Sequence, residues 1–454
     1  MNFAIILAAG KGTRMKTELP KCAVPLLGKP MVSYLIDSVY KTTIDRSICV
    51  LGHGKEVFYK LLGDTCEYAI QERQLGTAHA VNCAKDIVGD NVGYSIIIPG
   101  DTPLIDETII QGLIDTHFYN KNQLTVGTIF LDNPHGYGRI VRENGKIMRI
   151  VEEKDATDEI RAIKEINSGL MCVDNQILFE AISKISNNNA KGEYYLTDIV
   201  EIMSRDYEVG SHTFTDAYKL AGINDLYHLY EVETELRKDI NKKHMLNGVI
   251  LENADSITIG PDVKIESDAT IRQGSILLGK TIVRRHAIVG PNTECLNAVI
   301  EEGAIAKQSL ITDSTLGKQA TLGPFSHLRA HTVIGENDRI GNFVEIKNST
   351  LGPKTNVAHL TYIGDTTCGG GVNWGCGTVT INYDGKNKFR TNVGDNVFIG
   401  CNSNLVAPIT IASNTFIAAG STITDDLEDG DFTIARVKQV TKKGYAHKYG
   451  FRKV

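Results

Sequence analysis

The sequence lacks any long hydrophobic run. Its most apolar stretches, such as AIILAA and SIIIP, are far shorter than the roughly 20 residues that a membrane-spanning helix needs. No basic segment precedes the first apolar run, so we expect a buried strand there rather than a signal peptide. A net charge of −6 over 454 residues gives no general attraction to nucleic acid or to an anionic membrane. Neither is expected as a partner.

C-x-x-C pairs are also absent, although the chain has nine cysteines, at positions 22, 49, 66, 83, 172, 295, 368, 376 and 401. An odd number of scattered thiols is typical of a reduced, cytoplasmic protein. A zinc site is not expected, and most of these cysteines should be small buried apolar residues. No Ser/His/Asp or Cys/His set indicates covalent catalysis.

The first half of the chain alternates short apolar runs with helical stretches, for example FAIILAA, MVSYLIDSVYK, SICVLG, AHAVNCAKDIV and YSIIIPGD. This alternation predicts an α/β domain, a Rossmann-like, mainly parallel sheet covered by helices, over residues 1–226. The stretch DLYHLYEVETELRKDINKK contains no Gly or Pro and carries charges throughout. It predicts a long connecting helix, which we place at 227–247.

From residue 248 to 454 the pattern changes to a period of six. Apolar residues occupy positions 259, 265, 271, 277, 283, 289 and 295, then 316, 322, 328, 334, 340 and 346, and finally 393, 399, 405, 411, 417 and 423. A six-residue period is typical of a parallel β-helix built from hexapeptide repeats, with roughly nine or ten coils here. Chance periodicity in an ordinary all-β domain is the alternative, but it does not explain three separate registers. Known hexapeptide proteins are left-handed and trimeric.

Two segments interrupt these patterns. LAAGKGTRM, residues 7–15, places Gly10 and Gly12 after the first strand, flanked by Lys11 and Arg14. It lacks the last glycine of a dinucleotide fingerprint and the ending of a Walker loop, so it is either a phosphate-binding loop or a plain tight turn. Residues 364–391, GDTTCGGGVNWGCGTVTINYDGKNKFRT, break the hexads. We expect a Gly- and Asn-rich loop there that builds a site.

Further motifs follow in order: QERQLGTAHA (71–80), PGDTPLI (99–105), GYGRI (136–140), VEEKDA (151–156), EINSG (165–169) and GIND (222–225). With LAAGKGTRM they resemble the sugar-1-phosphate nucleotidylyltransferases. Together with the hexapeptide half, nearly the whole chain resembles the family that joins N-acetylglucosamine-1-phosphate uridylyltransferase to glucosamine-1-phosphate acetyltransferase. The resemblance implies synthesis of UDP-N-acetylglucosamine from glucosamine 1-phosphate, acetyl-CoA and UTP with Mg²⁺, for peptidoglycan and lipopolysaccharide.

The resemblance implies a set of residues for UTP and the sugar phosphate: Leu7, Ala8, Ala9, Gly10, Arg14, Lys21, Gln71, Gly76, Thr77, Pro99, Gly100, Asp101, Gly138, Glu152, Asn167 and Asn224. Cations and backbone N–H groups suit a triphosphate, which explains Arg14 and Lys21. Asp101 at a strand end and Asn224 match the Mg²⁺ ligands.

For the base and the sugar, the resemblance carries over two smaller groups. Gln71, with Gly76 and Thr77, matches the segment that reads uracil, where glycine lets the chain approach closely. Gly138, Glu152 and Asn167 match the groups around the N-acetyl sugar. The adjacent Glu153 is a rival for the role of Glu152, although VE.KDA favours Glu152.

In the hexapeptide half, His359 matches the family's catalytic base. Arg329 and Lys347 lie 18 residues apart, so they should stack about 5 Å apart on one face and hold the phosphate of the sugar between them. Tyr362 and Asn373 match sugar-binding residues. Acetyl-CoA is expected at Cys376, Asn382, Tyr383, Cys401, Ala419 and Arg436. Relatives commonly have Ala and Ser where this chain has Cys376 and Cys401, and a thiol is a weak donor.

Two other functions remain open from the sequence. The hexapeptide half could serve only assembly or regulation of a single-activity nucleotidylyltransferase, although His359 and the Arg329/Lys347 pair argue for a second site. The chain could also be a non-enzymatic scaffold of the same two-domain build, which the intact Lys21 and Asp101 oppose. For the bifunctional enzyme we expect a homotrimer with the acetyl site between neighbouring chains.

Overall fold

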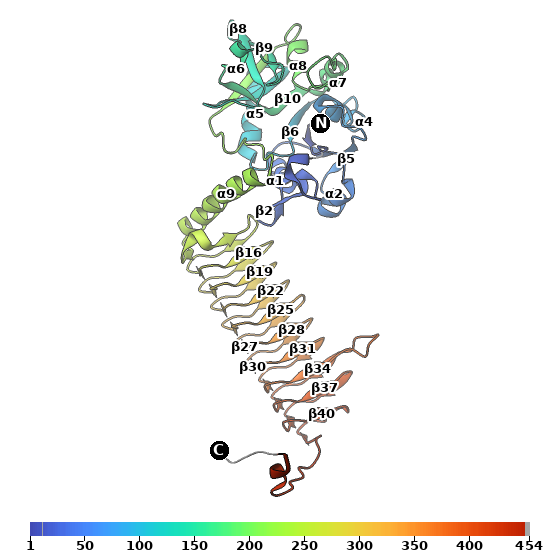
Figure 1. The fold of residues 1–454 in the computed structure, drawn as a ribbon, viewed down its shortest axis with the longest axis vertical. Coiled ribbons are helices and arrows are strands. Elements are labelled where there is room, and N and C mark those ends of the chain that lie inside the picture. The colour runs from blue at the N-terminus through green and yellow to red at the C-terminus, as the bar shows by residue number, and fades with distance from the viewer. Residues whose placement is uncertain (11, 450–454) are drawn as a thin grey trace. The chain divides into compact units, whose positions relative to one another are not determined.

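The computed structural model describes residues 1–10 and 12–449, so Lys11 lies outside the described residues. It comprises two compact units, Met1–Glu235 and Leu236–Val454 (Figure 1). None of the helices in the described part of the chain is both long enough and apolar enough to cross a membrane.

The first unit is built on a nine-stranded sheet with the main order β11-β7-β10-β6-β1-β4-β5. Its strands are β1 (Phe3–Leu7), β4 (Arg46–Leu51), β5 (Glu67–Ile70), β6 (Tyr94–Pro99), β7 (Leu124–Phe130), β8 (Arg139–Glu143), β9 (Lys146–Val151), β10 (Glu165–Asp174) and β11 (Val209–Phe214). β1 runs parallel to β4 and β6, as the sequence predicts. β10 runs antiparallel between β6 and β7, and β8 and β9 form an added hairpin. The sheet is therefore mixed.

Helices complete this unit: α1 (Met31–Val39), α2 (Lys55–Leu62), α3 (Thr77–Asn82), α4 (Lys85–Val88), α5 (Glu107–Tyr119), α6 (Asp158–Arg161), α7 (Asn175–Ser183) and α8 (Asp198–Met203). Alternate residues of β1 enter two different hydrophobic clusters, with Ala4 and Ile6 in one and Phe3 and Ile5 in the other. A central strand buried on both faces is typical of an α/β fold covered on both sides.

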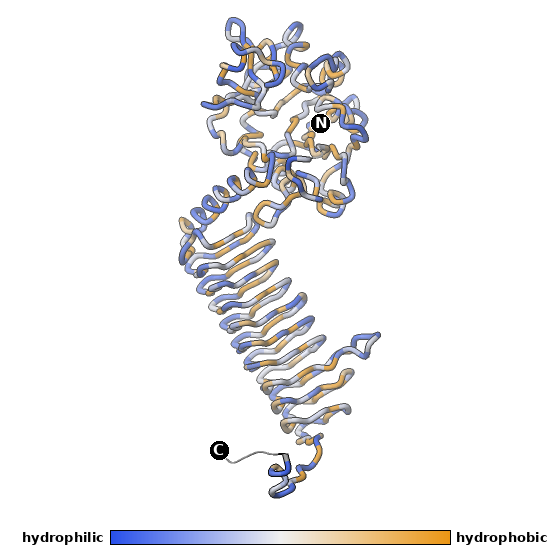
Figure 2. The backbone as a smooth tube through the Cα atoms, in the orientation of Figure 1, coloured by the Kyte–Doolittle hydropathy of each residue, from blue (hydrophilic) through white to orange (hydrophobic). Residues whose placement is uncertain are grey.

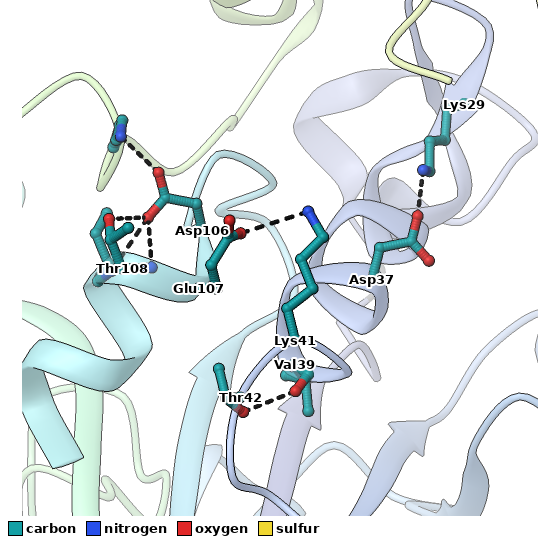
Figure 3. A network of polar contacts seen from close by, with 10 residues as sticks. Lys29, Asp37, Val39, Lys41, Thr42, Asp106, Glu107 and Thr108 are labelled. Atoms are coloured by element: carbon teal, nitrogen blue, oxygen red, sulfur yellow. Dashed lines mark hydrogen bonds and ion pairs between the residues drawn. The ribbon is translucent and has the colours of Figure 1, made fainter. Parts of the chain in front are cut away.

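A polar network fixes the start of α5, which follows the segment that contains Asp101 (Figure 3). Asp106 caps this helix and accepts hydrogen bonds from the amides of Thr108 and Ile109, each at 3.1 Å. Asp106 also forms an ion pair with Lys219. This pair ties the chain just before the GIND motif to the start of α5, which follows the PGDTPLI motif.

The long helix α9 (Leu226–Leu246) contains the boundary between the two units. Its first half bonds to the first unit, where the Tyr218 hydroxyl donates to the Val232 carbonyl at 3.1 Å. In its second half, the buried Asn241 amide donates to the carbonyls of Ala254 and Ile257, at 2.9 and 3.1 Å. Each half therefore belongs to its own unit.

The second unit is a parallel β-helix with three sheets of eleven, ten and nine strands. The first sheet runs from β12 (Ile250–Leu251) to β41 (Phe432–Thr433) and includes β27 (Arg339–Asn342), β30 (Asn356–His359), β33 (Asn373–Trp374), β36 (Phe398–Ile399) and β39 (Phe416–Ile417). The second runs from β13 (Thr258–Ile259) to β40 (Thr422–Ile423) and includes β25 (His327–Arg329), β28 (Glu345–Lys347), β31 (Tyr362–Gly364), β34 (Val379–Ile381) and β37 (Asn404–Val406). The third runs from β14 (Lys264–Ile265) to β38 (Ile409–Ile411) and includes β32 (Thr366–Cys368) and β35 (Thr391–Val393).

The hexapeptide prediction is confirmed. Every predicted apolar position lies in the interior of this β-helix, and only Ile265 among them is partly exposed. Figure 2 shows hydrophobic and hydrophilic segments alternating in each coil. Pairing of each strand with the one three strands later gives the three flat faces of the left-handed hexapeptide fold.

The expected long loop over 364–391 is wrong in extent. Coils continue through β32, β33 and β34, and only residues 382–390 leave the stack, as the projecting hairpin beside β34 in Figure 1. The hexads break in sequence because other residues fill the interior here: Trp374 is 1% exposed, and Thr366, Thr378 and Thr380 are buried. Buried threonines bond to the backbone, as Thr378 does to the Gly375 carbonyl at 2.7 Å.

A buried carboxyl group in the β-helix gives a prediction for stability. Asp338 accepts the amides of Thr355 and Gly335, each at 2.8 Å, yet its burial raises its pKa to about 6. Because the pKa of Asp338 is raised, the contribution of this carboxyl group to stability is present below the ordinary aspartate pKa and is lost as the pH rises through 6. Between pH 4 and 7, the unfolding free energy of the wild type should therefore fall by up to ~3 kcal/mol relative to that of Asp338→Asn, which cannot ionise.

Denaturation at several pH values measures this difference. Trp374, the chain's single tryptophan, lies in the β-helix core and so reports on this unit alone. Parallel pH profiles for the two proteins would contradict the prediction.

Candidate functional sites

A cavity of about 480 Å³ lies at the carboxyl ends of β1 and β6, where parallel sheets bind ligands. Most of the residues predicted for nucleotide and sugar line it: Leu7, Ala9, Gly10, Arg14, Lys21, Gln71, Gly76, Thr77, Pro99, Asp101, Glu152, Asn167 and Asn224. These residues come from motifs spread over more than 200 positions, and the sheet brings them together.

Three predicted residues do not line the cavity. Ala8 is 2% exposed and packs in the hydrophobic core. Gly100 follows β6, and its amide donates to the Leu7 carbonyl at 3.0 Å. The Gly138 carbonyl accepts the Asn167 amide at 2.9 Å. Gly100 and Gly138 therefore support the cavity through backbone hydrogen bonds.

Cations and oxygen ligands meet at one end of the cavity. The Lys21 Nζ lies 2.5 Å from Asp101 Oδ2 and 3.2 Å from Asn224 Oδ1. Arg14 donates to the same Asn224 oxygen at 2.8 Å, and the Ile223 amide donates to the Asp101 carbonyl at 2.8 Å. The two predicted metal ligands therefore face a common point, which the Lys21 ammonium occupies.

This donor set fits Mg²⁺, which takes one or two protein oxygens and completes its shell with water and phosphate. A positive group already lies between the two oxygens, so the position favours a cation. Among the described residues, no group of three His, Cys, Asp or Glu side chains could hold a metal alone.

Gly12 explains how Lys21 reaches this position. Its φ of 58° is in the left-handed region that favours glycine, and a Cβ there would lie 2.5 Å from the Lys21 Cβ. Any side chain at residue 12 would displace the lysine.

The segment predicted to read uracil is held by its own hydrogen bonds. The Gln71 Nε2 donates to the Gly76 carbonyl at 3.1 Å and lies 3.0 Å from the His79 Nδ1. Gly76 has a φ of 122°, and a Cβ there would lie 2.4 Å from the Tyr194 carbonyl oxygen. The packing of Tyr194 therefore requires glycine at this position, and the expected close approach to the nucleotide stays a prediction.

Elsewhere in the cavity, the structure separates the roles of Glu152 and its neighbour Glu153. Glu152 lines the cavity and accepts the Thr197 hydroxyl at 3.1 Å, and its burial raises its pKa. Glu153 instead accepts the Arg139 guanidinium at 2.8 Å and the Gly136 amide at 3.1 Å. Only the first of the two carboxylates faces the cavity.

Sequence reasoning missed several residues that line this cavity, including Cys22, Gln74, Glu193 and Thr197. Burial raises the pKa of the Cys22 thiol to about 12, so this side chain is an apolar part of the cavity wall and not a nucleophile. Glu193 and Thr197 belong to a segment that reaches the cavity only through tertiary packing. No local pattern marks them.

In the β-helix, the predicted base lies on one edge of the prism. We call the corners that join the first sheet to the second the histidine edge; it carries Asn342, His359, Cys376, Cys401 and Ala419. His359 pairs with Asn342 one coil earlier, and its Nδ1 lies 2.8 Å from the Asn342 Oδ1. Asn342 was missed, although the spacing of one coil that predicted the Arg329/Lys347 stack also points to it.

The same edge continues through the predicted acetyl-CoA residues. The Asn402 amide donates to the Cys376 carbonyl, and the Gly420 amide donates to the Cys401 carbonyl, each at 2.7 Å. The Arg436 side chain donates to the Ala419 carbonyl. These contacts place four of the six predicted residues in one column, whereas Asn382 and Tyr383 belong to the 382–390 hairpin.

Arg329 and Lys347 are neighbours in register on β25 and β28, as predicted. A bound phosphate is not the only anionic partner available, because Arg329 donates to the Glu345 carboxylate at 2.7 Å. Lys388 of the 382–390 hairpin lies beside Lys347, and its hydrogen bond and then its charge, with a smaller effect from Arg329, lower the pKa of Lys347. The cluster thus has a third cation that sequence reasoning missed.

Most of the remaining predicted residues lie near this cluster, but Asn373 belongs to the first sheet and not to the second, which carries Arg329 and Lys347. Tyr362 begins β31 beside Glu345, and Asn373 begins β33. The buried Asn382 amide donates to the Asp365 carboxylate, which fixes the base of the hairpin. The Tyr383 hydroxyl donates to the Gly385 carbonyl at 2.6 Å, and its backbone pairs with Lys388.

Comparisons with known proteins agree with both sites. Residues 3–228 match the nucleotidyl transferase family, 258–367 the GMPPB C-terminal domain, and 390–425 the bacterial transferase hexapeptide (six repeats) family. The bifunctional protein GlmU of Acholeplasma laidlawii is 49% identical over 98% of this chain and 97% of its own length. The GlmU proteins of Exiguobacterium sibiricum and Clostridium novyi are each 46% identical, over 98% and 99% of this chain and 99% of their own lengths.

Similarity of this extent, with both kinds of domain present, sets aside the single-activity and non-enzymatic alternatives. The chain is a transferase with nucleotidyltransferase and acetyltransferase activities. It therefore belongs to the bifunctional GlmU family, whose two halves, a uridylyltransferase and a glucosamine-1-phosphate acetyltransferase, together make UDP-N-acetylglucosamine.

Proposed function

We propose that the cavity of the first unit and the histidine edge of the second carry the two steps. The edge transfers the acetyl group of acetyl-CoA to glucosamine 1-phosphate, and the cavity couples the product to UTP and releases pyrophosphate. The observation that carries this proposal is the meeting of Lys21, Asp101 and Asn224 at the strand ends. Mass spectrometry of the products from glucosamine 1-phosphate, acetyl-CoA, UTP and Mg²⁺ tests it.

Assays that omit one substrate at a time separate the two steps. Without UTP the product should be N-acetylglucosamine 1-phosphate, and without acetyl-CoA no nucleotide sugar should form from the amine. Release of coenzyme A without an acetylated sugar would contradict the proposal.

For uridylyl transfer, the chain must bring together two polyanions. Arg14 and Lys21, with the backbone N–H groups of Gly10 and Gly12, neutralise the triphosphate, so that a sugar phosphate oxygen attacks the α-phosphorus in line. Asp101 and Asn224 would hold Mg²⁺, which supplies charge neutralisation on the phosphates when bound. Gln71 and Thr77 bind the base, and Glu152 and Asn167 orient the sugar.

The raised pKa of Glu152 gives a pH prediction for this step. If the ionised carboxylate accepts sugar hydroxyl groups, its protonation weakens sugar binding. Because burial raises the pKa, protonation begins closer to neutral pH than for an exposed glutamate. The KM for N-acetylglucosamine 1-phosphate should therefore rise on mild acidification.

Glu152→Gln should have a high KM that no longer changes with pH in this range. Glu153→Gln is the matched control, because that side chain turns away from the cavity, and it should keep the wild-type pH profile. Steady-state kinetics between pH 5 and 8 measures both profiles. A wild-type pH profile in Glu152→Gln would refute the role of Glu152 in sugar binding.

For acetyl transfer, His359 is the base. If its Nδ1–H donates to Asn342, the Nε2 lone pair can accept the proton that the amine loses as it attacks the thioester carbonyl. Arg329, Lys347 and Lys388 bind the sugar phosphate, with Tyr362 and Asn373 beside the sugar. Acetyl-CoA lies along the column from Cys376 to Arg436, and coenzyme A leaves as the thiol.

We further propose a homotrimer, located in the cytoplasm, that supplies cell-envelope synthesis. Phe398, Phe416 and Phe432 form an exposed stack on the outer face of the first sheet, with ring centroids 4.6 and 5.2 Å apart. An apolar ladder on a flat face suits contact with another copy of the chain. Light scattering at micromolar concentration should give three times the mass of one chain, and a monomer would contradict this.

A further inference from the structure

Two cysteines occupy the same corner of consecutive coils on the histidine edge. The strands before them pair in register, Trp374 with Ile399, and two further residues lead to Cys376 on one strand and Cys401 on the other. The Asn402 amide donates to the Cys376 carbonyl at 2.7 Å, so the alignment continues into the corner. The two cysteines are therefore direct neighbours along the edge.

Their spacing suits a covalent bond between them. Neighbouring strands lie about 4.8 Å apart, within the Cα separation of about 4.4–6.8 Å that disulfides require. Side chains on successive coils of this edge also reach one another, as the 2.8 Å contact between His359 and Asn342 shows.

Both thiols are accessible. Cys22, Cys49, Cys172, Cys295 and Cys368 are buried, whereas Cys376 is half-buried and Cys401 is exposed. The other accessible cysteines in the described residues, Cys66 and Cys83, belong to the first unit. An edge that admits coenzyme A also admits a small oxidant.

We propose that Cys376 and Cys401 form a redox modification site, at which a peroxide joins the two thiols as a disulfide and stops acetyl transfer. One thiolate attacks an oxygen of hydrogen peroxide and the O–O bond breaks, which gives a sulfenic acid and a hydroxide that takes up the proton lost by the thiol to form water. The second thiolate attacks the sulfenic sulfur and displaces hydroxide, which takes up a proton. Overall, two thiols and one hydrogen peroxide give one disulfide and two waters: sulfur is oxidised and peroxide oxygen is reduced.

The effect on acetyl transfer rests on the proposed function of this edge. The disulfide would tie together two corners at which acetyl-CoA is expected, one coil from His359. A displacement of about 1 Å between a bound substrate and its base lowers a rate by roughly 100-fold. Uridylyl transfer, which uses the cavity of the first unit, is not affected.

The test uses the full-length protein treated with hydrogen peroxide, then with catalase. Mass spectrometry of unreduced peptides should find the segments containing residues 376 and 401 joined, with the loss of two hydrogens. Acetyl transfer, followed by product mass, should fall by roughly 100-fold and return with dithiothreitol. The rate of uridylyl transfer in the same sample should stay unchanged.

Variants separate this site from other thiols. Cys376→Ala and Cys401→Ala, each compared with its own reduced activity, should lose the sensitivity to peroxide. Cys83→Ala is the matched control and should keep it. Absence of the joined peptide, or acetyl transfer that survives its formation, would overturn the proposal. A joined peptide in a protein whose reduced form transfers no acetyl group would instead overturn the proposed function.

Discussion

Replacing Asp101 by alanine should lower the rate of UDP-N-acetylglucosamine formation by about 10²–10³-fold, the usual cost of losing one preorganised electrostatic contact to the reacting groups. Asp101 lies 2.5 Å from the Lys21 ammonium and shares that cation with Asn224. Without the carboxylate, the site loses a metal ligand and also the group that fixes Lys21. Pyrophosphate release from UTP and N-acetylglucosamine 1-phosphate measures the effect.

Two controls make this result specific. Acetyl transfer by the same variant should keep its wild-type rate, because its site lies in the second unit. Asp132→Ala removes an exposed aspartate that pairs with Lys164 at 3.1 Å, outside the cavity, and should leave both activities intact. Full uridylyl transfer in Asp101→Ala would refute the assigned role, whereas equal loss of both activities would indicate unfolding.

His359→Ala should have the opposite pattern, with acetyl transfer reduced by about 10²–10⁴-fold, the usual contribution of a general base. The variant retains the cation cluster of Arg329, Lys347 and Lys388, so the KM for glucosamine 1-phosphate should change little while kcat falls. Initial rates of N-acetylglucosamine 1-phosphate formation measure both constants.

His331→Ala is the matched control for this variant. His331 is also an exposed histidine of the β-helix, but it lies between β25 and β26 (Val333–Ile334), on a different edge of the prism. Its acetyl transfer should equal that of the wild type. A kcat in His359→Ala within a few-fold of wild type would exclude His359 as the base.

The two halves of the fold differ in how far sequence predicts them. A hexad fixes both the direction and the depth of each side chain, so Ile259 or Leu328 can be placed in the interior from position alone. The same rule correctly predicted that Arg329 stacks on Lys347. It failed over 364–391 because Trp374 and buried threonines replace the aliphatic residues that mark a coil.

The cavity of the first unit was predictable only where a motif marks it. Lys21, Asp101 and Asn224 belong to short signatures, and all three meet in the structure. Thr197 and Lys388 act from segments whose position depends on tertiary packing, so no spacing predicts their contacts with Glu152 and Lys347. The packing of Gly76 against Tyr194 was not predictable for the same reason, since Tyr194 is remote in sequence.

The second half of α9 also caps the end of the β-helix. Ile240 packs against the first coils, and Asn241 satisfies two of their carbonyl groups. A stack of parallel strands otherwise ends in a row of open backbone groups, which is a template for aggregation. Expression of the acetyltransferase half from residue 248 onward would remove this cap. A start at Leu236 would keep the cap and should yield a protein that aggregates less.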